Sequence, residues 1–178
     1  MSKFVAIDPI VGAPAPMSAT ATSQQWQLGY AVQGFDVATG ASSLNLGAAS
    51  FVYVVGSNVA SIGQFVMVSN SSAVLLAAAN SASFFPIGVA AGNLSASNVF
   101  GWVQVGGLCD YARGTNSAIA AGVPLYIAAG TAGFLVTNVV AGNHVQGVVC
   151  PVSYTSSQSS ALTVQLFNPF VAGLTASL

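Results

Sequence analysis

The chain has 178 residues, enough for one domain with its own core, and only 3% of them are charged, against about 25% in an average globular protein. Lys and Arg together number two, which excludes nucleic-acid binding by phosphate neutralisation, because such binding takes about six or more cations. With a formal net charge of −1, copies of the chain hardly repel one another, so the composition favours a structural protein packed into a larger assembly.

Residues 1–25 predict an extended N-terminal arm. Three prolines lie close together in it, and proline neither donates to a central strand nor continues a helix. The accompanying residues are too apolar for a free tail, so we expect them to pack on this chain or on a neighbour. The candidate interface residues of the arm are Phe4, Ile7, Pro9, Ile10, Pro14 and Pro16.

Residues 26–167 predict a single all-β domain, a small barrel or sandwich. Short runs of β-branched and aromatic residues alternate with Gly, Asn and Ser, as is typical of strands joined by tight loops. The expected strands are 26–33, 50–55, 64–69, 73–78, 86–92, 99–106, 123–128, 133–137, 145–153 and 161–167. Gln104 and Gln165 interrupt apolar runs with period two, which indicates one buried face and one polar, uncharged face.

The sequence predicts an internal repeat of a four-strand unit within the domain, at about 63–106 and 122–167. Gly63 and Gly122 open corresponding strands 59 positions apart, and Gly88 and Gly147 lie inside the third strand of each copy at the same spacing. The fourth strands, around Gln104 and Gln165, align at a spacing of 61. Two copies are too few for a solenoid and suit one closed or face-packed domain. The glycines within the third strands predict a bulge or sharp bend.

A membrane-spanning helix is an alternative for residues 119–141, which carry no charge over 23 positions. Pro124, several glycines and the absence of flanking Lys or Arg argue against it. The N-terminus does not resemble a secretory signal, because Asp8 and Pro9 interrupt its apolar run at once. We therefore expect the chain to stay in the cytoplasm and its two cysteines, Cys109 and Cys150, to be reduced.

Catalysis has little support in the sequence. His144 is the only histidine and follows what reads as a turn, and no Gly-x-Ser-x-Gly elbow presents a nucleophile. The residues Cys109, Asp110, His144 and Cys150 do not have the spacing of a metal site. No phosphate-binding glycine loop is present. We expect no catalytic residue, no metal and no cofactor.

Two further groups are candidate contacts with other chains. Asp110 and Arg113 are the only clustered opposite charges, and they read either as an exposed loop pair or as an inter-subunit contact. Residues 168–178 follow the last expected strand and predict an apolar docking tail, with Phe167, Pro169 and Phe170 as its candidate interface residues. Trp26, Tyr53 and Trp102 read as core or interface anchors, or as an aromatic binding surface.

Residues 26–167 resemble the capsid decoration (cement) proteins of tailed bacteriophages. The resemblance lies in the runs 26–29, 49–54, 86–90, 101–105, 121–126 and 145–148. It implies a small β-barrel-like protein that adds to the outside of the capsid shell, often as a trimer, and reinforces it against the pressure of the packaged DNA. Members of the family commonly carry charged residues where this chain has Gly106 and Gly107, so ionic docking is in doubt.

The leading hypothesis is therefore a capsid decoration protein of the virion, assembled in the host cytoplasm. Its expected partners are the major capsid protein and other copies of itself, as a trimer or a dimer, with no nucleic acid and no membrane. A phage tail, fibre or receptor-binding β module is the second hypothesis and predicts a low copy number. A small hydrolase is the third, and predicts an activity that His144→Ala alters.

Overall fold

The computed structural model describes residues 4–6, 17–36, 46–57, 60–77, 85–115, 118–137, 143–155 and 161–172. These residues form strands and turns, with no helix among them, so the predicted all-β class is confirmed. The strands are β1 (Phe4–Ala6), β2 (Ala31–Asp36), β3 (Ala48–Gly56), β4 (Phe65–Ser69), β5 (Ser72–Leu75), β6 (Ile87–Ala90), β7 (Phe100–Ala112), β8 (Leu125–Ile127), β9 (Leu135–Val136), β10 (His144–Val149) and β11 (Leu162–Ala172). A helix long and apolar enough to cross a bilayer is not found in the described part of the chain.

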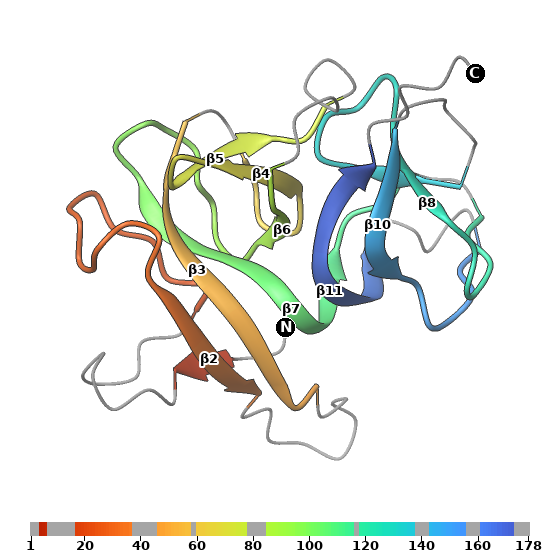
Figure 1. Ribbon diagram of the computed structural model, residues 1–178, viewed down its shortest axis with the longest axis horizontal. Coiled ribbons are helices and arrows are strands. Elements are labelled where there is room, and N and C mark those ends of the chain that lie inside the picture. The colour runs from red at the N-terminus through yellow and green to blue at the C-terminus, as the bar shows by residue number, and fades with distance from the viewer. Residues whose placement is uncertain are drawn as a thin grey trace.

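The described strands are hydrogen-bonded in the order β1-β2-β3-β5-β4-β6-β7-β11-β10-β8-β9. Two groups of four have the same internal pairing: β4 pairs with β5 and β6, and β6 with β7, while β8 pairs with β9 and β10, and β10 with β11. We call β4–β7 the first unit and β8–β11 the second unit. They meet where β7 and β11 pair antiparallel, and they form the two lobes of Figure 1.

Strand β3 adds a further connection to the first unit only. It pairs in parallel with β5 and antiparallel with β7. The strands β3, β5, β4, β6 and β7 are therefore hydrogen-bonded in a closed circuit. One buried cluster takes a side chain from each of these five strands, together with Ala60 and Leu94. The five contributions are Val54, Ala73, Val66, Ala90 and Val103.

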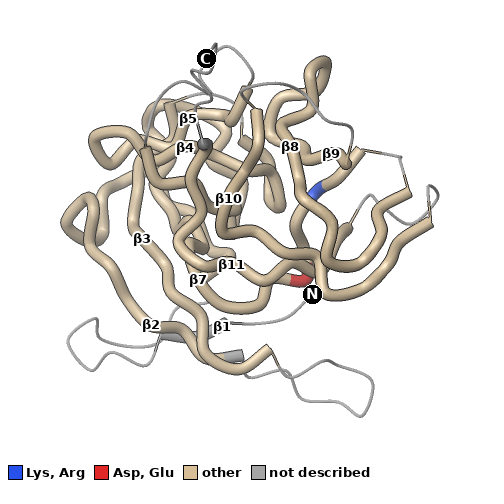
Figure 2. Tube along the Cα trace, turned by 45° about the vertical axis from the view of Figure 1, so that its right-hand side comes forward, with Lys and Arg blue, Asp and Glu red and all other residues tan. Residues whose placement is uncertain are grey.

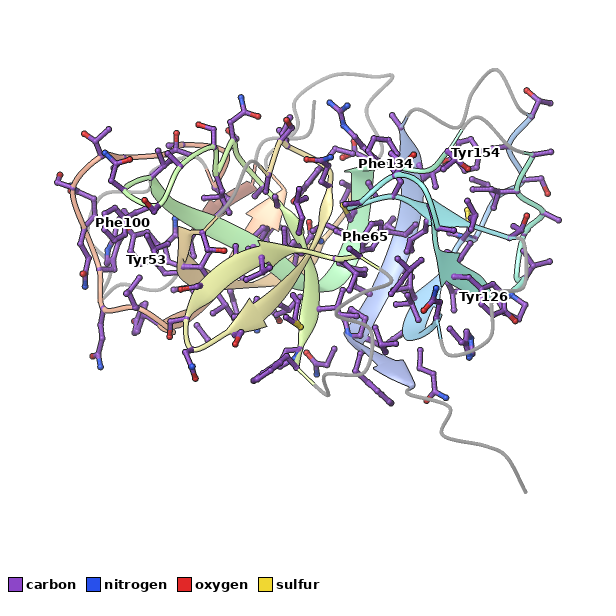
Figure 3. The ribbon with its side chains drawn as sticks, turned by 90° about the horizontal axis from the view of Figure 1, so that it is seen from above. Tyr53, Phe65, Phe100, Tyr126, Phe134 and Tyr154 are labelled. Atoms are coloured by element: carbon purple, nitrogen blue, oxygen red, sulfur yellow. The ribbon has the colours of Figure 1, made fainter. Side chains whose placement is uncertain are left out.

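Two other buried clusters fill the rest of the molecule. The larger lies between the units and includes Phe65, Leu125 and Leu166. The other packs the start of the described chain onto β3 and β7, with Met17 buried beside Tyr53 and Trp102. Figure 3 shows Tyr53 and Phe100 at one end of the molecule, Tyr126 and Tyr154 at the other, and Phe65 between them.

Strand β7 is long because it pairs with β6 of the first unit and with β11 of the second. Its first half pairs with β3 and β6, and its second half pairs with β11. At the change of partner Gly107 has a φ of +87°, and a Cβ there would lie 2.6 Å from the Ala48 carbonyl oxygen, so glycine is required. The expected strand 99–106 was therefore too short.

The buried side chain of Gln104 holds this change of partner in place. Its Nε2 donates to the carbonyl oxygens of Gly106 (3.2 Å) and Leu108 (2.9 Å), and its Oε1 accepts from the Tyr111 hydroxyl (2.8 Å). Gln104 is fully buried, so the interpretation of this glutamine as part of a polar exposed face was wrong. A buried amide satisfied on both sides is instead a structural feature of the strand.

The glycines in the third strands differ between the units. Gly147 of β10 has a φ of +76° and lies at a shift of register against β11, which confirms the bulge predicted there. Gly88 of β6 lies in an unbroken register with β4. A Cβ on Gly88 would lie 2.4 Å from Val103 Cγ1 and 2.5 Å from the Gln104 carbonyl oxygen, so close approach of β7, not a bulge, requires glycine.

Candidate functional site: an uncharged apolar face

The last strand has an irregularity that decides where its side chains point. Gln146 pairs with Phe170 and Val148 with Leu166, so residues 167–169 of β11 lie opposite the single residue Gly147. Asn168 has a φ of +48°, the left-handed conformation that asparagine adopts more readily than most residues. A Cβ on Gly147 would lie 2.8 Å from the Phe167 carbonyl oxygen, so the β10 side of the bulge requires glycine.

Two phenylalanines of β11 lie on the outside, and the bulge is the reason for one of them. Leu166 and Val171 are buried in the large cluster, and an uninterrupted alternation between Leu166 and Phe170 would bury Phe170 as well. Phe167 follows the buried Leu166 and points outward by ordinary alternation, with 62% of it exposed, whereas the bulge changes the alternation for Phe170, which is 41% exposed. We call the outward side chains of these two strands the β10–β11 outer face. They are Gln146, Val149, Gln165, Phe167 and Phe170.

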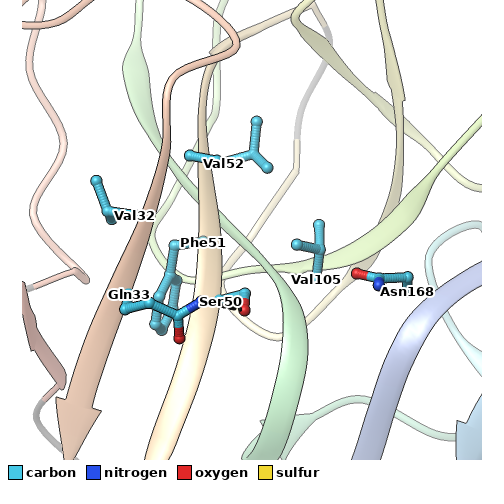
Figure 4. A pocket seen from close by; sticks show the side chains of 8 residues that line it. Val32, Gln33, Ser50, Phe51, Val52, Val105 and Asn168 are labelled. Atoms are coloured by element: carbon cyan, nitrogen blue, oxygen red, sulfur yellow. Dashed lines mark hydrogen bonds between the residues drawn. The ribbon is translucent and has the colours of Figure 1, made fainter.

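An apolar groove adjoins this face at Phe170. One hollow of about 450 Å³ is lined by Val52, Pro86, Ile87, Val105, Asn168, Pro169 and Phe170. A second, of about 560 Å³, shares Val52, Val105 and Asn168 and continues across β3 to β2 (Figure 4). Its polar contribution is neutral, since Gln33 Nε2 donates to Ser50 Oγ at 2.9 Å. Phe85, which is 38% exposed, precedes Pro86 at the rim.

No charged side chain lines either hollow or belongs to the outer face as described. In Figure 2, blue and red mark only short stretches of the part of the chain that is drawn in colour, and the rest of that part is tan. Asp110 lies within β7 and Arg113 directly after it, and both are half-buried, so the interpretation as an exposed loop pair was wrong. The reason is that β7 continues to pair with β11 as far as Ala112.

Arg113 makes its contacts within the chain. Its Nε donates to the Ile62 carbonyl oxygen at 3.0 Å, and its main-chain N–H donates to the Gly63 carbonyl oxygen at 2.9 Å. The guanidinium thus stabilises the turn that precedes β4. An inter-subunit role for Asp110 and Arg113 stays a prediction.

Aromatic side chains around Tyr53 of β3 form a second feature of the molecule. The ring of Tyr53 lies 5.2 Å from that of Trp26, 5.0 Å from that of Trp102 and 6.3 Å from that of Phe100. The Gln25 main-chain N–H donates to the Tyr53 hydroxyl at 3.1 Å. A hollow of about 240 Å³ lies beside these rings. Tyr53 and Trp102 are buried, so they are core residues, while Trp26 and Phe100 are partly accessible.

The residues considered for catalysis lie on strands β7 and β10 or directly after them. His144 begins β10, and its ring lies 5.2 Å from that of Tyr126. Cys109 and Cys150 are free and buried in the large cluster. Burial raises the pKa of both thiols, for Cys109 to about 12, so they are protonated and unreactive at neutral pH. Among the described residues, no group of three or more His, Cys, Asp or Glu could hold a metal ion.

The predicted interface residues fall into two groups. Ile7, Pro9, Ile10, Pro14 and Pro16 lie outside the described residues, while the backbone of Phe4 lies in β1 and pairs with Asp36 of β2.

The second group lies on β11. Phe167, Pro169 and Phe170 belong to this strand, which runs to Ala172, so placing them in a tail beyond the last strand was wrong. The bulge lets the strand pass Pro169, whose missing N–H would otherwise interrupt the ladder.

The sequence reasoning did not find the groove. Val52 and Val105 come from strands far apart along the chain, and only the β3–β7 pairing brings them together. Asn168-Pro169 was the one local signal, because an asparagine before a proline is typical of a break in regular structure.

No family model, no curated protein and no solved structure matches this chain, so the function rests on the fold and the surface just described.

Proposed function

We propose that this chain is a structural protein of a viral capsid, which decorates and stabilises the outer shell by binding the major capsid protein. The observation that carries the proposal is the uncharged apolar face and groove, with its phenylalanines held outward on paired strands. Large exposed apolar surface on a soluble domain is typical of protein interaction sites. A shell of many identical contacts needs no strong single contact, because each apolar patch contributes again at every copy.

The chemistry of the surface supports this class over a catalytic one. Its polar groups near the face are amides and hydroxyls, such as Gln33 and Ser50, which hydrogen-bond without the cost of removing a charge from water. The resemblance to phage decoration proteins adds the kind of assembly, and its motifs at 49–54, 86–90 and 101–105 fall within β3, β6 and β7.

We further propose that the domain is a small barrel with a repeated unit. The closed circuit of β3, β5, β4, β6 and β7 around one shared buried cluster supports the barrel. The identical pairing order of the two units supports the repeat, as do Gly63 and Gly122, which both have positive φ. Their N–H groups donate to Ala90 and Cys150, at the end of the third strand of each unit.

The test of the proposed function is the location and number of copies in purified particles. A decoration protein is present at a fixed, high number on the outside of every shell, which electron cryomicroscopy and quantitative mass spectrometry measure. Deleting residues 1–16 is expected to abolish attachment while the domain stays folded. Normal attachment of this shortened chain would remove the arm from the proposal, and a few copies per particle would contradict decoration.

The aromatic hollow favours one second candidate, a tail, fibre or receptor-binding module. Trp26 and Phe100 offer partly accessible rings beside Thr20 and Gln25, a combination suited to a small neutral ligand. This function predicts a low copy number at the tail. The same particle measurement therefore separates the two candidates.

A further inference from the structure

We infer that the β10–β11 outer face and the adjoining groove bind a second copy of this chain, with Phe167 of one copy in the groove of the next. The inference deepens the proposed function by naming one partner and one surface, and it rests on that function's premise that the chain works in an assembly.

The first support is that the exposure of the phenylalanines is built into the backbone. Three local features act together: the left-handed Asn168, the missing N–H of Pro169 and a glycine opposite them that no other residue could replace. Without this bulge Phe170 would join the core. A bulge that turns an apolar side chain towards water weakens the ladder, and the 41% of Phe170 that stays exposed is not buried in the isolated chain. The cost is compensated when another surface covers the two rings.

The second support is that the surface carries both a projection and a hollow. Phe167 is the most exposed large apolar side chain among the described residues, at 62%. The hollow of about 450 Å³ begins one residue further along β11, at Asn168. A surface with a knob and a hole at different positions can join head to tail with copies of itself, and such contacts close into rings when the rotation allows.

The third support is the charge of the partner. The face and the groove hold neither a cation nor an anion among the residues that line them, so a charge on the partner would be buried without an opposite charge. Most protein surfaces carry many charges, whereas this chain has five charged residues in 178. A second copy of this chain is therefore a suitable partner, because its surface is also almost free of charge.

The required area is available. A stable interface buries about 800 Å² on each partner, which is about a tenth of the 8365 Å² surface of this chain. The residues of the face, the groove and the rim at Phe85 come from six strands, β2, β3, β6, β7, β10 and β11, and from the segment that leads into β6. Most of them lie on hydrogen-bonded strands, so we expect little ordering entropy to be lost on association.

The test is the mass of the full chain in solution, measured by light scattering from about 1 to 100 µM. The wild type is expected to form oligomers in this range. Phe167→Asp and Phe170→Asp each place a charge in the contact and are expected to weaken association at least about tenfold. Phe167 is 62% exposed in the isolated chain, so the thermal midpoint of Phe167→Asp should stay within a few degrees of the wild type, while Phe170, which is 41% exposed, is expected to lose more.

The matched control is Val152→Asp. Val152 is 47% exposed and lies outside both the face and the groove, so this variant should associate like the wild type. A wild type that stays monomeric at 100 µM would overturn the inference, as would unchanged association of Phe167→Asp. Equal loss in Val152→Asp would also overturn it, because it would indicate unspecific apolar association.

Particle binding separates this inference from the proposed function. If the Phe167→Asp chain still decorates shells at full copy number, the decoration proposal stands, and contact between copies is not required for decoration. If the wild type oligomerises but no particle contains it, the self-contact stands and the capsid proposal fails.

Discussion

Gln104 in the first unit and Gln165 in the second align in the sequence but differ in burial and in hydrogen bonding. Gln104 is buried and makes three hydrogen bonds at 2.8 to 3.2 Å, whereas Gln165 is half-exposed and donates from Nε2 to the Leu166 carbonyl oxygen at 3.5 Å. The comparison extends to Gly63 and Gly122, which share a positive φ but not their surroundings. The first unit packs the aligned residues against β7, and the second leaves them near the surface.

The glycines at the start of each unit give the largest expected difference. A Cβ on Gly63 would lie 2.1 Å from the Tyr111 carbonyl oxygen, in addition to the strain of a φ of +85°. Gly63→Ala is therefore expected to lower the free energy of unfolding by more than about 5 kcal/mol, or to prevent folding.

Gly122→Ala is the matched control. It has a φ of +74° with no atom within 4 Å of a Cβ, and should cost only about 1 to 2 kcal/mol of backbone strain. Urea denaturation followed by tryptophan fluorescence measures both variants. Similar losses in the two would mean that the surroundings of the units do not differ as described.

The two glutamines give the next difference. Gln104→Leu removes the partner of the Gly106 and Leu108 carbonyls and of the Tyr111 hydroxyl, which we expect to cost about 2 to 4 kcal/mol. Gln165→Leu, the same change in the second unit, should stay within about 0.5 kcal/mol of the wild type. The unfolding midpoints in urea compare the pair. A loss in Gln165→Leu as large as in Gln104→Leu would show that both glutamines support their strands equally.

The buried thiols give an effect that appears only at alkaline pH. Burial raises the pKa of Cys109 to about 12, whereas a cysteine in the unfolded chain titrates near about 8.5. The folded state therefore holds a proton that the unfolded state releases. The resulting stability is complete below about pH 8.5 and falls by up to about 1.4 kcal/mol per pH unit as the pH rises towards 12.

Cys109→Ala should make this alkaline slope shallower, in urea unfolding measured from pH 7 to pH 11 with reductant. The remaining slope comes from Tyr111, whose pKa burial also raises, and from Cys150. An unchanged slope in the variant would mean that the Cys109 thiol does not stay protonated in the folded chain.

The pattern of residues predicts the strands better than it predicts their ends. Alternation identified β3 to β11 in outline, because half-buried strands repeat with period two. It placed the ends of β7 and β11 too early, since both strands continue through a break in the alternation, at Gly107 and at Asn168. A bulge depends on the strand opposite, and that strand was not known from the sequence.

The candidate site shows the same division. The sequence drew attention to Phe167, Pro169 and Phe170 as apolar and late in the chain, and the structure places all three on one strand beside the groove. The groove itself arises from the meeting of β3, β7 and β11, which are separated by up to about a hundred residues. Local patterns do not carry such long-range pairing.

Strand β7 has one more consequence, which concerns force. Its backbone passes without interruption from the circuit with β3 to the pairing with β11, so a pull on one unit reaches the other through covalent bonds and not across a surface that can slip. Each half of β7 is hydrogen-bonded along its length. Pulling the units apart along the strand direction would therefore have to break many of these hydrogen bonds at the same time. We therefore expect the two units to resist stretching together. The buried amide of Gln104 stabilises the part of β7 where the pairing partner changes from β3 to β11.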